Sequence, residues 1–482
     1  MRDAGFDVDR IHGTPSRGDG HPSRAPGPRA VLDLREAVAI IVGIVVGAGI
    51  FEAPSLVAGM TGSEGWMLAA WGLGGLVSLI GALCYAELAT AFPSAGGDYH
   101  FLGRAYGRRV AFLFAWARFS VITTGSIALL AFVFGDYMSQ LLPLGRHSAA
   151  LYAGAAVVVL SGVNLHGIRS GATTQTWLTL FEVGGLMLII IAGLYLTTGG
   201  GASVEMAQRA AEAAPAGAPS LAAFGLAMVF VLLTFGGWNE AAYISAELKD
   251  ERRNMVKALV LSILAITALY LAVNWAYWRG LGMAGMAQSN AVAADLLKAA
   301  FGPAGAMLIS AMVAVAALTS INATMIVGSR TNFAVGRDWP SLSRLGGWDE
   351  TRGTPRVALA LQSAAALVLV VIGSSAGGGF KAMVEFTAPV FWIFFLLSGI
   401  SLFVLRVREP DVPRPFRVPI YPLLPLLFCA MCAYMLWASL SYVSSQELGG
   451  FNAAWIGVGV LASGALLLLV LGKPGKAGSE GA

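Results

Sequence analysis

Two glycine-rich stretches interrupt long apolar segments and could bind a ligand with main-chain groups. The first contains Gly47-Ala48-Gly49-Ile50 and the second contains Phe235-Gly236-Gly237. Glycine in the middle of an apolar helix weakens it and allows the backbone to unwind. Unwound N–H and C=O groups survive in hydrocarbon only where they are buried or line a polar cavity. The alternative is that these small residues merely let helices pack closely.

The direction of the chain through each interruption predicts the charge of the ligand. A half-helix that begins near Ala48–Phe51 offers free N–H groups and a positive dipole end. A half-helix that ends near Leu233–Phe235 offers free carbonyls and a negative end. Donors for an anion beside acceptors for a cation suit a zwitterion, and an α-amino acid carries both charges a few ångströms apart.

Ionisable residues inside apolar segments are the second group that could have a functional role, because charges at membrane depth are costly and usually functional. Arg118 and Glu182 each lie about nine residues into a segment, which is ~13 Å of helix. They could form a structural ion pair, or Glu182 could bind a proton or a cation. Glu240 could cap a half-helix or contact a cationic substrate side chain.

The composition requires a membrane protein with many spans. Of 482 residues, 57% are apolar and only 12% are charged, which is too few charges to solvate several soluble domains. A span needs about 20 apolar residues. We predict twelve spans, at about 38–59, 66–90, 109–140, 150–167, 174–197, 221–246, 256–278, 301–326, 356–374, 384–405, 419–441 and 452–471.

The basic residues predict the orientation. With the N-terminus inside, 25 lysines and arginines fall in inner segments and 5 in outer loops, so both termini should be cytoplasmic. The predicted organisation is then as follows: a disordered cytoplasmic tail at 1–37, a five-helix repeat at 38–197, an outer loop at 198–220, a second five-helix repeat at 221–405, two further helices at 406–472 and a cytoplasmic tail at 473–482.

The histidines, basic residues and cysteines argue against metal binding, nucleic-acid binding and a disulfide-linked partner. The five histidines have no metal-ligand spacing, and no phosphate-binding glycine–lysine loop occurs, so we expect no metal, no cofactor and no enzymatic activity. Nucleic-acid binding is not expected either, because the basic residues form no single patch. The cysteines are Cys84, Cys429 and Cys432, all within spans. None lies in outer loop 141–149, so no disulfide-linked heavy chain is expected.

Five motifs in order and at family spacing resemble the amino acid–polyamine–organocation permease superfamily, particularly the bacterial relatives of the L-type amino acid transporters. They are Gly43-Ile44-Val45-Val46-Gly47-Ala48-Gly49-Ile50-Phe51, Tyr85-Ala86-Glu87-Leu88 with Pro93-Ser94-Ala95-Gly96-Gly97-Asp98-Tyr99, Phe235-Gly236-Gly237-Trp238-Asn239, Gly328-Ser329-Arg330 with Arg337-Asp338, and Arg408-Glu409-Pro410-Asp411 with Pro413-Arg414-Pro415-Phe416-Arg417-Val418-Pro419.

The resemblance implies an all-α fold with a 5+5 inverted repeat, discontinuous helices 1 and 6 and two extra helices. It implies alternating access and an amino acid held by the N–H groups of Gly47, Ala48 and Gly49 and by carbonyls of Leu233, Thr234 and Phe235. Leu233 stands where relatives often carry an aromatic gate, and Glu182 stands where many carry a lysine. Further candidate pocket residues are Ile50, Gly236, Trp238, Asn239 and Thr123.

Coupling and substrate stay open at this point. Thr319 and Ser320 resemble the hydroxyl pair of a sodium site, although such residues are common in membrane helices. Glu87, Glu247 and Asp338 are expected to pair with Arg104, Arg330 and Arg337 as an inner gate. We expect a symporter or exchanger, driven by H⁺ or Na⁺, for neutral amino acids in the inner cell membrane. Cationic amino acids or polyamines are the alternative substrates, and a channel or membrane enzyme is the rival class.

Overall fold

The computed structural model describes residues 34–92, 97–166, 172–198, 217–239, 251–349, 351–352, 354–375, 379–443, 447–448 and 451–471. Within these ranges the regular secondary structure is helical apart from one short antiparallel hairpin, β1 (Glu447–Leu448) and β2 (Phe451–Asn452), and an isolated bridge between Asp349 and Thr354. Most of both predicted tails and of the predicted outer loop 198–220 lies outside the described residues.

The first half of the chain forms a series of helices, two of which are made of consecutive pieces. They are α1 (Leu34–Val45), the 3₁₀ turn η1 (Ala48–Phe51), α2 (Ala53–Thr61), α3 (Glu64–Ala91), α4 (Asp98–Tyr106), α5 (Arg108–Ala117), the π-helical turn η2 (Arg118–Thr123), α6 (Thr124–Leu141), α7 (Ser148–His166) and α8 (Ala172–Thr197). The π turn joins α5 to α6 within the long third predicted span, and such turns are frequent at functional sites.

The second half continues with longer helices. They are α10 (Leu221–Thr234), α11 (Glu251–Gln288), α12 (Val292–Asp338), the 3₁₀ segment η4 (Pro340–Gly346), α13 (Arg356–Ser375), α14 (Gly379–Arg408), α15 (Leu423–Val443) and α16 (Ala453–Leu471). Gly282 in α11 and Gly302 in α12 have positive φ, and each marks a kink between two helical pieces.

The helices are those of a multi-pass membrane protein. Eight helices in the described ranges are long and apolar enough to cross a bilayer. Large apolar side chains are exposed on the outer faces of the helices, among them Val371 of α13 and Leu469 and Val470 of α16, as expected for surfaces that face lipid rather than water. The exact count of twelve spans and the 5+5 symmetry stay predictions.

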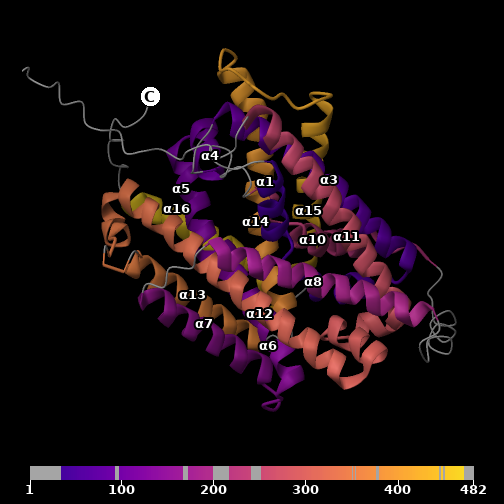
Figure 1. Ribbon diagram of the computed structural model, residues 1–482. Helices are drawn as coiled ribbons and strands as arrows, with labels where there is room; N and C mark the ends of the chain where they lie inside the picture. The colour runs from indigo at the N-terminus through magenta and orange to yellow at the C-terminus, as the bar shows by residue number, and fades with distance from the viewer. Residues whose placement is uncertain are drawn as a thin grey trace, which may run out of the picture.

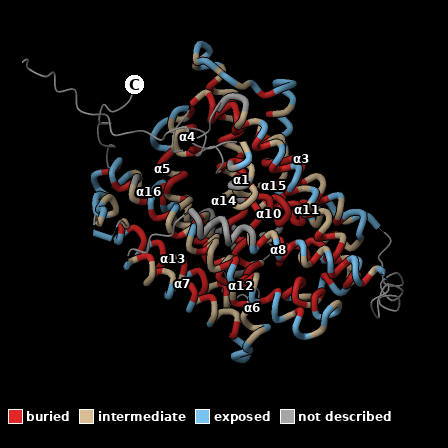
Figure 2. Tube along the Cα trace, in the orientation of Figure 1, coloured by how far each residue is buried: buried red, intermediate tan, exposed pale blue. Residues whose placement is uncertain are grey.

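The bundle is held together by close contacts at small residues. A Cβ added to Gly135 of α6 would lie 2.1 Å from the carbonyl oxygen of Ala149, next to the start of α7, and one on Gly125 would lie 2.1 Å from Thr387 of α14. Glycine therefore sets the helix spacing here, as in other membrane bundles. Figure 1 shows α1, α10 and α14 in the middle of the view, with α12 crossing the molecule beside α6, α8 and α13. Buried residues run through this interior, whereas exposed residues gather on the periphery (Figure 2).

Candidate functional site

The first helix is interrupted at the glycine-rich stretch. Regular α-helix ends at Val45, Gly47 is extended with φ −122° and ψ −173°, and the chain resumes as the 3₁₀ turn η1 before α2 begins at Ala53. Pro54 in the first turn of α2 suits a helix start, where its missing N–H is not needed. The N–H groups of Gly47, Ala48 and Gly49 stand at the start of η1, where a helical turn offers them no acceptor.

The helix at the second glycine-rich stretch also ends there. α10 runs to Thr234, and the backbone turns at Phe235-Gly236-Gly237, with Gly237 in the left-handed region at φ 108° that favours glycine. The carbonyl of Leu233 accepts a hydrogen bond of 3.0 Å from the N–H of Gly236. Residues 240–250, including Glu240 and Glu247, lie outside the described residues.

The two interruptions touch one another. A Cβ built on Gly49 would lie 3.3 Å from Oγ1 of Thr234 and 3.7 Å from its Cα. The hydroxyl of Tyr270 on α11 lies 3.1 Å from the carbonyl oxygen of Val45 and 3.3 Å from that of Thr234. One phenol thus connects the last carbonyls of both broken helices, and Gly49 of η1 lies against Thr234 of α10.

The surroundings of the interruptions are mostly aromatic. Phe235 packs against Tyr270 and Trp71, with ring centroids 5.0 and 6.1 Å apart. Trp238 instead packs against Tyr85 and Phe395, at 5.2 and 5.8 Å. A Cβ on Gly47 would meet no atom within 4 Å, so open space adjoins the interruption at this residue.

The remaining candidate binding residues are buried but lie at different places. Ile50 and Asn239 are buried in their respective interruptions. Thr123, in the π turn, packs on α12, since its Cγ2 would lie 2.4 Å from a Cβ on Gly328.

The candidate coupling residues also lie on separate helices. Glu182 of α8 is buried and close enough to Tyr270 to act on it electrostatically. None of the ion pairs found among the described residues includes Glu182, and the Arg118–Glu182 pair stays a prediction. Thr319 donates to the carbonyl of Val315, and the carbonyl of Ser320 accepts from Thr324, so both belong to the hydrogen bonding of α12.

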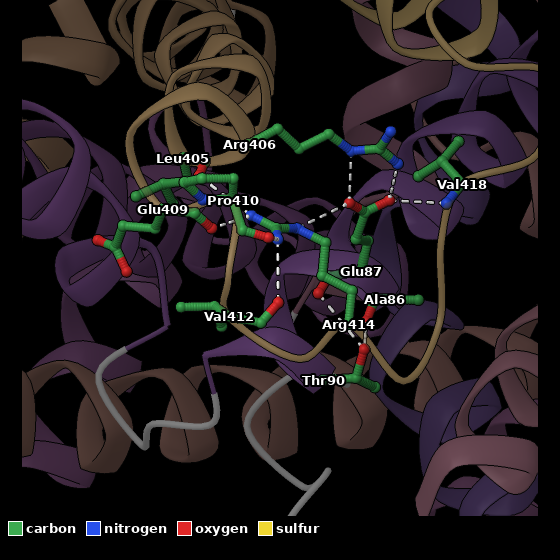
Figure 3. A network of polar contacts seen from close by, with 10 residues as sticks. All are labelled: Ala86, Glu87, Thr90, Leu405, Arg406, Glu409, Pro410, Val412, Arg414 and Val418. Atoms are coloured by element: carbon green, nitrogen blue, oxygen red, sulfur yellow. Dashed lines mark hydrogen bonds and ion pairs between the residues drawn. The ribbon is translucent and has the colours of Figure 1, made fainter.

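A polar network at the end of α3 connects it to α14 and the following loop. Glu87 accepts hydrogen bonds from Nε and Nη2 of Arg406, at 2.7 and 2.5 Å, and from the N–H of Val418 at 2.7 Å. Nε of Arg414 lies 3.6 Å from the same carboxylate. Figure 3 shows both arginines turned toward Glu87. Arg414 also holds the loop by donating to four carbonyls, those of Leu405, Glu409, Pro410 and Val412.

This network corrects the predicted inner ion pairs. Arg104 pairs with Glu409 rather than with Glu87, at 2.6 Å between Nη2 and Oε2. That guanidinium lowers the pKa of Glu409, mainly through the hydrogen bond. Asp338 accepts a hydrogen bond of 3.0 Å from Tyr99, and burial together with this carboxylate raises the pKa of Tyr99 to about 12. The Tyr99 hydroxyl and the Arg104 guanidinium therefore both serve as hydrogen-bond donors at neutral pH.

Several polar residues near the interruptions were missed from the sequence. Glu52 directly follows η1, and Asp136 and Tyr137 lie on α6, where the hydroxyl of Tyr137 donates to the carbonyl of Phe51 at 2.8 Å. The sequence did indicate Glu52 and Asp136 in one respect, because both carboxylates lie within predicted spans, where charges are usually functional. The described residues contain no group of side chains suited to hold a metal ion.

Comparison with known proteins gives a consistent picture. The sequence profile of the family described as "Amino acid permease" matches residues 32–461. The b(0,+)-type amino acid transporter 1 of Mus musculus is 29% identical over 84% of this chain and 82% of its own length, as is that of Homo sapiens. The large neutral amino acids transporter small subunit 2 of Mus musculus is 30% identical over 84% of this chain and 76% of its own length.

Proposed function

The chain belongs to the amino acid permease family, whose matched relatives are transporters and not enzymes, and from this premise we propose that it carries neutral amino acids by alternating access. The observation that supports this most is the contact of the two helix interruptions at Gly49 and Thr234, beside open space at Gly47. One relative, the large neutral amino acids transporter small subunit 2, supports the same substrate class by its name.

In the proposed binding mode, main-chain groups recognise the two charges common to all amino acids. The substrate carboxylate accepts from the N–H groups of Gly47, Ala48 and Gly49, at the positive end of η1. The ammonium group donates to the carbonyls of Leu233, Thr234 and Phe235. The apolar side chain lies against buried Ile50 and aromatic neighbours, with Gly236, Trp238, Asn239 and Thr123 as further pocket residues.

We further propose that the bundle sits in the inner cell membrane with both termini cytoplasmic and no disulfide-linked heavy chain. The Glu87 network then lies on the cytoplasmic side. The transporter works as an H⁺ or Na⁺ symporter or as an exchanger, with Glu182, Arg118, Thr319, Ser320 and Glu240 as candidate coupling residues. Rocking of one helix bundle against the rest would expose the site to each side in turn.

A second candidate function is transport of cationic amino acids or polyamines. Glu182 favours it, because this buried carboxyl lies near Tyr270 at the interruptions and could neutralise an extra positive charge.

Binding and counterflow experiments test both candidates. A thermal-shift screen of the twenty amino acids and common polyamines should show stabilisation by neutral amino acids, because a ligand that binds only the folded state raises the midpoint. Internal unlabelled substrate should accelerate uptake of labelled substrate into proteoliposomes. Stabilisation by polyamines alone would favour the second candidate, and the absence of counterflow would refute a carrier.

A matched pair of variants locates the site. Gly47→Leu should abolish binding without loss of stability, because its side chain would enter the open space beside the interruption. Gly154→Leu on α7 is the control, since a Cβ there also meets no atom within 4 Å. Equal binding by both variants would show that the substrate lies elsewhere.

A further inference from the structure

A pair of acidic side chains lies directly behind the first interruption. Glu52 is the residue between η1 and α2 and is 7% exposed, and Asp136 comes from α6. The hydrogen bond from Tyr137 to the carbonyl of Phe51 fixes this part of α6 against the chain at Glu52. The two carboxyl groups are close enough to repel one another electrostatically.

The pair has buried polar neighbours that lack partners of their own. Among the described residues, Oε1 of Glu52 has no hydrogen-bond partner, and neither has the hydroxyl of Tyr277 on α11. Tyr277 is fully buried and lies near enough to Glu52 to interact with it electrostatically. Burying the Glu52 oxygen and the Tyr277 hydroxyl without hydrogen bonds costs free energy, unless a bound species supplies the missing partners.

No described cation neutralises the pair. Besides one another, the two carboxyls interact electrostatically with the phenols of Tyr137 and Tyr277. Charged residues on the helices packed around them are exposed or have other partners: Arg146, His147, Arg279 and Lys298 are exposed, Asp295 accepts a hydrogen bond of 2.6 Å from Ser289, and Lys381 lies 3.7 Å from Glu385. Two like charges beside one another with no described cation favour a state in which the pair holds a proton.

We propose that Glu52 and Asp136 form a proton-binding site that couples amino acid transport to the proton gradient. This inference rests on the proposed function. Glu52 directly follows η1, whose N–H groups are the proposed carboxylate site, so any movement of the outer half-helix on substrate binding also moves Glu52 relative to Asp136. A proton from water on one side binds a carboxylate oxygen when the pair is accessible, and leaves to water on the other side after the bundle has changed state.

Transport assays in proteoliposomes distinguish proton coupling from substrate transport itself. With labelled leucine as probe, an acid-outside gradient of one pH unit can drive up to about tenfold accumulation for one coupled proton, since one pH unit is a tenfold ratio of proton concentrations. Wild type should accumulate leucine in response to this gradient. Glu52→Gln and Asp136→Asn should lose that accumulation but keep leucine counterflow at equal pH on both sides.

A control variant makes the test specific. Glu64→Gln, at an exposed position at the start of α3, should accumulate leucine like wild type. The proposal is overturned if wild type shows counterflow but ignores the pH gradient, if a sodium gradient drives uptake instead, or if both pair variants stay coupled.

A spectroscopic measurement tests the pair independently of transport. Purified wild type at neutral pH should show an infrared C=O stretch of a buried protonated carboxyl that is missing in the Glu52→Gln/Asp136→Asn double variant. A variant that does not fold is recognised by its thermal midpoint, and the single variants then replace it. Absence of leucine counterflow in wild type would refute the proposed function, whereas absence of the infrared difference would refute the proton site.

Discussion

Glu87→Gln should strongly destabilise the folded transporter, because it removes the charge on which two arginines converge. The carboxylate is only 2% exposed, and the side chains of Arg406 and Arg414 are 18% and 5% exposed. It accepts three hydrogen bonds of 2.5 to 2.7 Å, two from Arg406 and one from the N–H of Val418. Removing one member of a buried ion pair typically costs ~3–5 kcal/mol, because the remaining charges stay buried without compensation.

The comparison is with Glu409→Gln, which breaks an ion pair of the same chemistry at the same end of the bundle. The side chains of Arg104 and Glu409 are 41% and 25% exposed, so solvent screens the pair and its loss should cost only ~0–1 kcal/mol. The free energy of unfolding is measured by denaturant titration in mixed micelles. Glu87→Gln combined with Arg406→Met should regain part of the loss, because fewer uncompensated charges remain.

Equal losses of unfolding free energy in Glu87→Gln and Glu409→Gln would show that burial does not make the Glu87 network more important than the exposed pair. Unchanged protease sensitivity of the loop at 409–418 in Glu87→Gln would show that Glu87 does not hold that loop in place.

Three further predictions follow from other contacts. Gly135→Ala should destabilise by at least ~1–3 kcal/mol, the usual cost of overpacking, because its Cβ would meet the Ala149 carbonyl at 2.1 Å; Gly154→Ala is the control, and equal midpoints for the two would contradict the close α6–α7 contact. Tyr270→Phe should weaken substrate binding and lower stability by about 0.5–1.5 kcal/mol for the lost hydrogen bond; unchanged binding would show that Val45 and Thr234 do not need this donor. Because Arg104 lowers the pKa of Glu409, the contribution of that pair is present above the ordinary carboxyl pKa and is lost as pH falls through the lowered value. The stability difference between wild type and Glu409→Gln should therefore shrink as the pH falls below about 4 and disappear below the lowered pKa, and a difference that grows on acidification would contradict this sign.

The position of the first interruption was predictable from the sequence because its cause is local. Gly47 and Gly49 have no side chains to stabilise a helix in an apolar segment, and Pro54 favours a new helix start. The end of α10 at Thr234 follows from Gly236 and Gly237 in the same way. Such backbone preferences need no knowledge of distant residues.

The inner ion pairs could not be predicted in the same way, because partners are chosen by tertiary contact. Glu87 and Arg406 are 319 residues apart, and arginines at several other positions were equally available in the sequence. Arg414 was recognised within a family motif, yet its role in holding a loop to Glu87 required the fold.

Glu52 and Asp136 were missed for a related reason. Each is a single acid in an apolar segment, and neither has a motif of its own. Only the packing of α6 against η1, fixed by the hydrogen bond from Tyr137 to Phe51, brings the two carboxyls together.

The phenol of Tyr270 has a single hydrogen to give and two main-chain oxygens within reach. An incoming ammonium that donates to the Thr234 oxygen would leave that hydrogen wholly to Val45. Ligand binding at the end of α10 would thereby strengthen the hydrogen bond to Val45 at the end of α1. The Tyr270 side chain would transmit this effect directly from one broken helix to the other.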